Sequence, residues 1–136
     1  MADLRLEDRL YAYLRDLRAE AKPFDYGQFD CGRFVFRWVG ECGGPSIEPP
    51  YQSVEEAADY LEDLAHNHIA EIERAGWTPT DEPICGAVVM INFRGFPMFG
   101  IMGAEGLAIF VAHNGYREAR VTPVKAWNPC PLLQLP

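Results

Sequence analysis

Two hydrophobic periodicities, one following the other, constrain the fold of this chain most strongly. Apolar residues recur at helical spacing in residues 4–21, after Asp30 and again after Ser53. The last third instead contains short apolar runs separated by turn residues, as strands do, at 87–91, 98–102, 107–112 and 117–121. This order predicts an α+β domain whose N-terminal helices pack on a small antiparallel sheet or barrel.

Local signals predict where several elements begin and end. Asp3 can cap the first helix, and Ser53 with Glu56 forms a capping box at the start of a later one. A further helix is predicted at about 67–74. Residues 92–95 are typical of a turn, and Asn114-Gly115 is the strongest hairpin signal in the chain.

Length and charge limit the classes of function. The 136 residues are 49% hydrophobic, which fits one domain spanning 1–136. Twenty acidic residues against 12 basic ones give a net charge of -8, which opposes binding to nucleic acid phosphates or anionic lipid. No apolar stretch is long enough for a membrane span and no signal peptide is visible, so we expect synthesis in a cytoplasm.

The pair Asp30-Cys31 is the strongest candidate for chemistry. Asp30 is a good N-cap residue, and the apolar pattern that follows it places Cys31 in the first turn of a helix. Backbone N–H groups and the helix dipole can lower a thiol pKa there from about 8.5 to roughly 3.5–7.5. Cys31 is therefore a candidate nucleophile. The alternative is that Cys31 is simply a small buried apolar residue.

Residues around this cysteine are candidates for binding a substrate. The segment before it contains Phe24, Tyr26 and Phe29, and its Pro23 and Gly27 break any earlier helix. An aromatic loop at this point can wall a cleft. We predict that Tyr26, Phe29 and Asp30 border the substrate.

A cysteine nucleophile needs a base, which is usually a histidine. His66 and His68 lie two residues apart in a predicted helical region, where they do not share a face, and we interpret both as solvent-exposed. His113 is better placed, at the end of the third strand beside a turn. It is the predicted base, although a turn-edge histidine half in solvent explains it as well.

The other cysteines match no known ligand spacing. Cys42, Cys85 and Cys130 are widely separated, with no C-x-x-C pair. Their convergence on a metal in the folded chain stays open. No Gly-rich phosphate loop precedes a helix, and no cofactor is predicted.

Four segments in order resemble the NlpC group of papain-like cysteine peptidases. They are Asp30-Cys31 followed by Phe34-Val35, Gly86-Ala87-Val88-Val89-Met90, Phe99-Gly100-Ile101 and Ile109-Phe110-Val111. Small phage-encoded members are closer still. The entry from Pro23 to Cys31 and the pair Ala126-Trp127 are similar to their motifs, so the resemblance spans roughly residues 23–127.

The resemblance implies a papain-like NlpC-type fold with Cys31 as nucleophile. It also shows two departures. The catalytic histidine of the group falls at Met98, which cannot act as a base, and Ala87 replaces the aspartate of a Gly-Asp pair.

Two functions follow as expectations. In the first, a phage tail-associated peptidase cleaves peptidoglycan stem peptides with Cys31 and His113. In the second, the chain is a catalytically degenerate structural component of a tail tip or baseplate hub, with other tail proteins as partners. Either function would place the protein in the virion after synthesis in the host cytoplasm.

Overall fold

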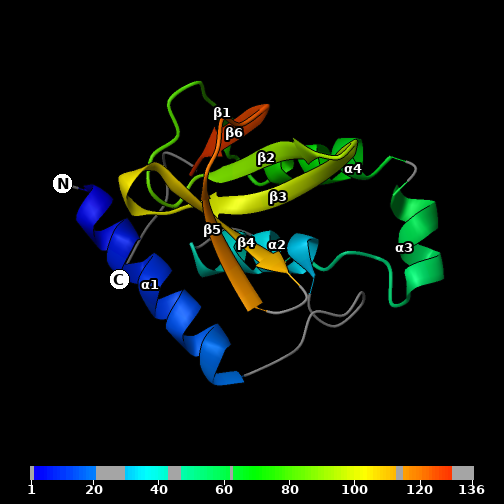
Figure 1. Cartoon of the computed structure of the whole chain (residues 1–136), viewed down its shortest axis with the longest axis horizontal. Helices are drawn as coiled ribbons and strands as arrows, with labels where there is room; N and C mark the ends of the chain where they lie inside the picture. Colours follow the sequence, from blue (N-terminus) through cyan, green and yellow to red (C-terminus); the bar gives the residue numbers. More distant parts are fainter. Residues whose placement is uncertain (1, 21–29, 43–46, 62, 113–114, 130–136) are drawn as a thin grey trace.

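The computed structural model describes residues 2–20, 30–42, 47–61, 63–112 and 115–129. Within these ranges the helices come first and the strands follow, so the predicted α+β class is confirmed (Figure 1). The helices are α1 (Ala2–Glu20), α2 (Cys31–Glu41), α3 (Val54–Leu61), α4 (Leu64–Arg74) and the short 3-10 helix η1 (Ala104–Gly106). The strands are β1 (Thr78–Pro79), β2 (Val88–Phe93), β3 (Phe96–Met102), β4 (Leu107–Ala112), β5 (Gly115–Arg120) and β6 (Lys125–Asn128).

The strands form one antiparallel sheet in the order β1-β6-β2-β3-β4-β5. Strands β2 to β5 make the predicted meander, and β6 returns to pair between β1 and β2. The turn between β2 and β3 is tighter than predicted: Phe93 pairs with Phe96, and only Arg94 and Gly95 connect them. Both have positive φ, 53° and 85°, as a two-residue hairpin turn requires.

Alternation along the strands gives the sheet two apolar faces. One face packs on the helices and belongs to the main core. Its strand residues are Val88, Met90, Phe99, Ile101, Ile109, Val111 and Trp127. The opposite face holds a smaller cluster made of Ala87, Val89, Met102, Ala108, Phe110 and Ala126, with Ile91, Met98 and Val121 packed against it.

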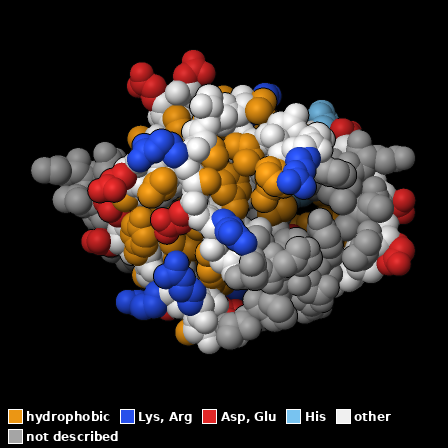
Figure 2. Space-filling model, viewed as in Figure 1, with side chains coloured by type: hydrophobic (Ala, Val, Ile, Leu, Met, Phe, Trp, Pro, Cys, Tyr) orange, Lys and Arg blue, Asp and Glu red, His pale blue; other side chains and the backbone are white. Residues whose placement is uncertain are grey.

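None of the described α-helices lies over the second face in the view of Figure 1, where the strands stand in front of α2. Figure 2 shows hydrophobic side chains gathered on this side of the molecule, with Lys and Arg groups around them. This side is called the open sheet face below.

Helix α2 is the central element of the main core. Phe34, Val35, Phe36, Trp38 and Val39 are all at most 1% exposed. The Trp38 indole nitrogen donates to the Gly86 carbonyl at 2.7 Å, which ties α2 to the segment before β2. On its other side, the Tyr13 hydroxyl of α1 donates to the Phe34 carbonyl at 2.6 Å. The sheet and α1 therefore fix α2 from both sides.

Several predicted boundaries are corrected. Helix α1 already includes Ala2, so Asp3 lies within the helix and is not its cap. Helix α4 begins at Leu64, before the predicted 67. The capping box is confirmed at Ser53, whose hydroxyl accepts from the Glu56 amide at 3.2 Å, but the Glu56 carboxylate accepts from the Gln52 amide instead of that of Ser53. In the described ranges, no helix combines the length and apolar character needed to cross a bilayer.

Candidate functional site

Asp30 and Cys31 start α2 as the sequence predicts. Asp30 has an extended backbone, and its carboxylate accepts from the Arg33 amide at 3.0 Å, which confirms it as the N-cap. Cys31 is the first residue of the helix. The thiol therefore lies at the end of α2 where free amide groups and the positive end of the dipole are found.

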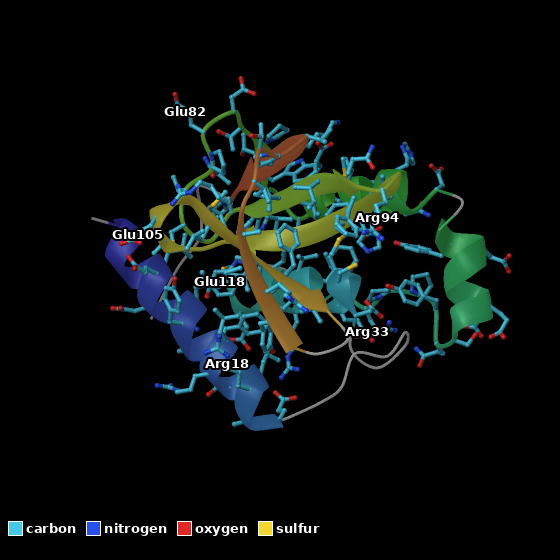
Figure 3. All side chains as sticks on the ribbon, viewed as in Figure 1. Arg18, Arg33, Glu82, Arg94, Glu105 and Glu118 are labelled. Carbon is cyan, nitrogen blue, oxygen red and sulfur yellow. The ribbon has the colours of Figure 1, made fainter. Side chains whose placement is uncertain are left out.

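Asp30 also anchors a buried polar network. Its side chain is 0% exposed and accepts from the Arg33 guanidinium at 2.8 Å and from the Tyr51 hydroxyl at 2.9 Å. The Arg33 guanidinium further donates to Glu48 and to the carbonyls of Pro49 and Tyr51, and it lies over the Tyr51 ring. Arg33 is labelled beside α2 in Figure 3. These contacts position the 47–51 segment against the first turn of α2. The predicted contact of Asp30 with a substrate stays a prediction.

Cys31 is partly exposed, yet its sulfur atom is shielded from water. Burial, followed by the neighbouring Asp30 carboxylate, raises its pKa to about 11. Hydrogen bonds from the backbone of Phe99, Gly32 and Cys31 itself lower the pKa, but by less than burial and Asp30 raise it. The predicted lowering of the pKa is therefore wrong. A carboxylate one residue away and the loss of water outweigh the helix N-terminus.

The amide of Phe99 is available to the sulfur because of the sheet register. Strand β3 pairs with β4 only at Ile101 opposite Ile109 and Met102 opposite Ala108. Phe99 lies just before this paired stretch, on the face toward α2. The first turn of α2 and the part of β3 that does not pair with β4 thus bring backbone groups to one sulfur atom.

We expect the protein to lose stability at alkaline pH through its cysteines. The pKa of Cys31 is raised to about 11 and that of Cys42 to about 12, chiefly by burial. The unfolded state therefore releases these protons first, so their stabilisation is complete below about pH 8.5 and declines as pH rises toward 11. Between pH 8.5 and 10.5, the free energy of unfolding measured in urea should fall by about 2 kcal/mol less in Cys31→Ala than in the wild type. Equal losses in both proteins would contradict the raised pKa of Cys31.

His68 is not where the sequence interpretation placed it. It was expected at the surface, but its side chain is 0% exposed, whereas His66 is exposed as predicted. The His68 ring stacks between Phe36 and Phe99, with centroid distances of 4.8 and 4.9 Å, and Tyr60 meets it edge-on at 5.5 Å. The missed signal is the spacing of His68 and Ile72, four residues apart on one buried helix face.

The imidazole edge of His68 faces the first turn of α2. A Cβ atom added to Gly32 would lie 2.4 Å from His68 Nε2, 3.3 Å from Cε1 and 3.0 Å from the Tyr51 hydroxyl. Only glycine allows this approach. One residue beyond the thiol, the helix backbone is therefore in direct contact with an imidazole from α4.

Met98, at the histidine position of the NlpC resemblance, belongs to the opposite face of the sheet. It pairs with Ile91 and packs against the cluster of the open sheet face. Ala87 is buried in the same cluster. Because neighbouring strand residues alternate between faces, Phe99 is the residue that β3 presents to α2.

A groove of about 690 Å³ lies beside this site, between α4 and the 47–50 segment. Phe36 and Tyr60, two of the three rings that contact His68, are among its lining residues. Its polar groups come from both sides. They are Glu48, His66, Asn67, Glu71 and Arg74.

The remaining predicted site residues are not all described. His113, Tyr26, Phe29 and Cys130 lie outside the described residues. Cys42 is a free thiol buried in the main core, and Cys85 is partly buried. Among the residues that the structure describes, no three His, Cys, Asp or Glu side chains are grouped to hold a metal ion.

Comparison with curated proteins and with solved structures finds no match. One family model matches residues 4–128, which is nearly the whole chain and includes every residue of the site described above. The chain therefore belongs to the family described as Domain of unknown function DUF6950.

Proposed function

We propose that this chain is a phage tail-associated, NlpC-like cysteine peptidase that cleaves peptidoglycan stem peptides, with Cys31 as the nucleophile. The observation that carries the proposal is the position of the thiol at the first residue of α2, partly exposed and faced by backbone groups of Phe99 and Gly32. The substrate and the tail association rest on the sequence resemblance to phage-encoded NlpC-like proteins.

The geometry favours acyl transfer through a neutral thiol. Backbone N–H groups at the helix start can stabilise the negative oxygen that forms when the sulfur adds to an amide carbonyl. At pH 7 a thiol with a pKa of about 11 is only about one ten-thousandth ionised, so a base must remove its proton as the S–C bond forms.

The test is digestion of purified peptidoglycan sacculi, measured as newly released amino groups. The wild type should release stem-peptide fragments, and Cys31→Ala should release none above background because the attacking atom is gone. Cys85→Ala is the control, since Cys85 is a partly buried thiol outside α2. Equal release by wild type and Cys31→Ala would remove the proposal.

A second candidate function is a structural component of a phage tail tip or baseplate hub. The open sheet face favours it, because Phe93 is 51% exposed and strand alternation places it on the same face as Ile91 and Val89 of the apolar cluster. Infectivity of particles that carry Cys31→Ala separates the two functions, because either protein would be part of the particle. With a structural component these particles stay infectious, whereas with a peptidase needed for wall penetration they lose infectivity.

A further inference from the structure

A reaction at Cys31 needs a proton acceptor. We compare Met98, at the histidine position of the NlpC resemblance, with the two described histidines, His66 and His68. Met98 is on the far face of the sheet, and His66 is exposed on the groove side of α4. His68 presents its Nε2 edge to Gly32, the residue next to the nucleophile. The imidazole thus comes from a helix, α4, and not from the strand that carries the histidine in the NlpC resemblance.

We infer that His68 is the general base for Cys31, an inference that rests on the proposed function. His68 Nε2 takes the thiol proton while the sulfur bonds to the amide carbonyl carbon. The resulting imidazolium gives that proton to the leaving amine nitrogen as the C–N bond breaks, and a thioester remains on Cys31. Water then attacks the thioester and passes a proton back through His68 to the sulfur, which releases a carboxylic acid and restores the thiol.

The surroundings of His68 suit this role. Phe36 and Phe99 clamp the ring on both faces, and Gly32 leaves room for its reacting edge. The neighbouring groove is lined by Phe36 and Tyr60, which both touch His68, whereas His68 itself is 0% exposed and is not among the residues that line it.

Most of the groups in contact with His68 carry no charge. From α2 and β3 it meets Gly32, Phe36 and Phe99, none of which titrates. Tyr51 and Tyr60 are the titratable neighbours, and burial raises the pKa of both phenols above their ordinary value. Both stay neutral from pH 5 to 9. Neither phenol can therefore produce an acid limb in the pH profile of the reaction.

The experiment compares His68→Gln and His68→Phe with the wild type, and uses His66→Gln as the matched control on the same helix. With a stem-peptide amide as substrate, kcat/KM of both His68 variants should fall by about 10²–10⁴-fold and lose its acid limb. His66→Gln should keep the rate and the limb. His68→Phe retains an aromatic ring in the stack, so it separates loss of the base from loss of packing.

A second readout needs no substrate. Alkylation of Cys31 by iodoacetamide at pH 7 should be at least about 10-fold slower in both His68 variants than in His66→Gln. Wild-type alkylation and kcat/KM in folded His68→Phe would overturn the role of His68, while loss of activity in Cys31→Ala would still support the peptidase. Slowed alkylation in a protein that digests no stem peptide would support the pair and refute the proposed substrate.

Discussion

Replacing Asp30 with Ala should lower the free energy of unfolding by about 3–5 kcal/mol, the largest stability effect expected in this site. The carboxylate is 0% exposed and accepts from Arg33 and Tyr51. Without it, a guanidinium that is only 7% exposed loses its buried counter-charge. The helix also loses its N-cap, which alone is worth about 1 kcal/mol. Urea unfolding monitored by tryptophan fluorescence measures the change.

Glu48→Ala is the matched control for Asp30→Ala. Glu48 binds the same guanidinium at 3.0 Å, but its side chain is 73% exposed. Water can replace it, so its removal should cost less than about 1 kcal/mol. Similar losses in both variants would show that burial does not strengthen the Asp30 pair.

Gly32→Ala should reduce kcat/KM by at least about 10²-fold although Cys31 is unchanged. In an exposed helix this substitution would stabilise the protein by about 1 kcal/mol. Here the new methyl group would lie 2.4 Å from His68 Nε2, inside a stack of aromatic rings that leaves little room to move. The imidazole must shift away from the first turn of α2. We therefore expect lost activity together with lower thermal stability.

A double variant separates the two effects of Gly32→Ala. His68→Ala removes the ring that the methyl group meets, so Gly32→Ala should cost less stability in that background than in the wild type. Activity should stay low because the base is absent. If the double variant loses as much stability as the two single variants added together, direct contact between Gly32 and His68 is contradicted.

The sequence predicts the fold class and the start of α2 because these depend on local chemistry. Periodicity shows where helices are followed by strands. Asp30 caps α2 locally, because its side chain accepts from the amide of Arg33, three residues later. Residues 107–112 were predicted as a strand with the boundaries that β4 has. The two-residue strand β1 was missed, because its register against β6 depends on a long-range pairing.

The site could be predicted only in part. The pKa of Cys31 depends on how much water the fold removes from the sulfur, which no sequence motif reports. His68 was misread because the predicted helix began too late, and its burial depends on rings contributed by α2, α3 and β3. The faces of Met98 and Phe99 depend on strand parity, and a shift of one residue reverses them.

Covalent trapping tests the central claim, attack by the Cys31 sulfur, most directly. The protein is incubated with a stem-peptide analogue that carries a vinyl sulfone in place of the scissile amide, and the adduct is mapped by mass spectrometry. The account predicts one adduct on Cys31, formed at least about 10-fold more slowly in His68→Gln. Labelling spread equally over Cys31, Cys42 and Cys85, or none on Cys31, would contradict it.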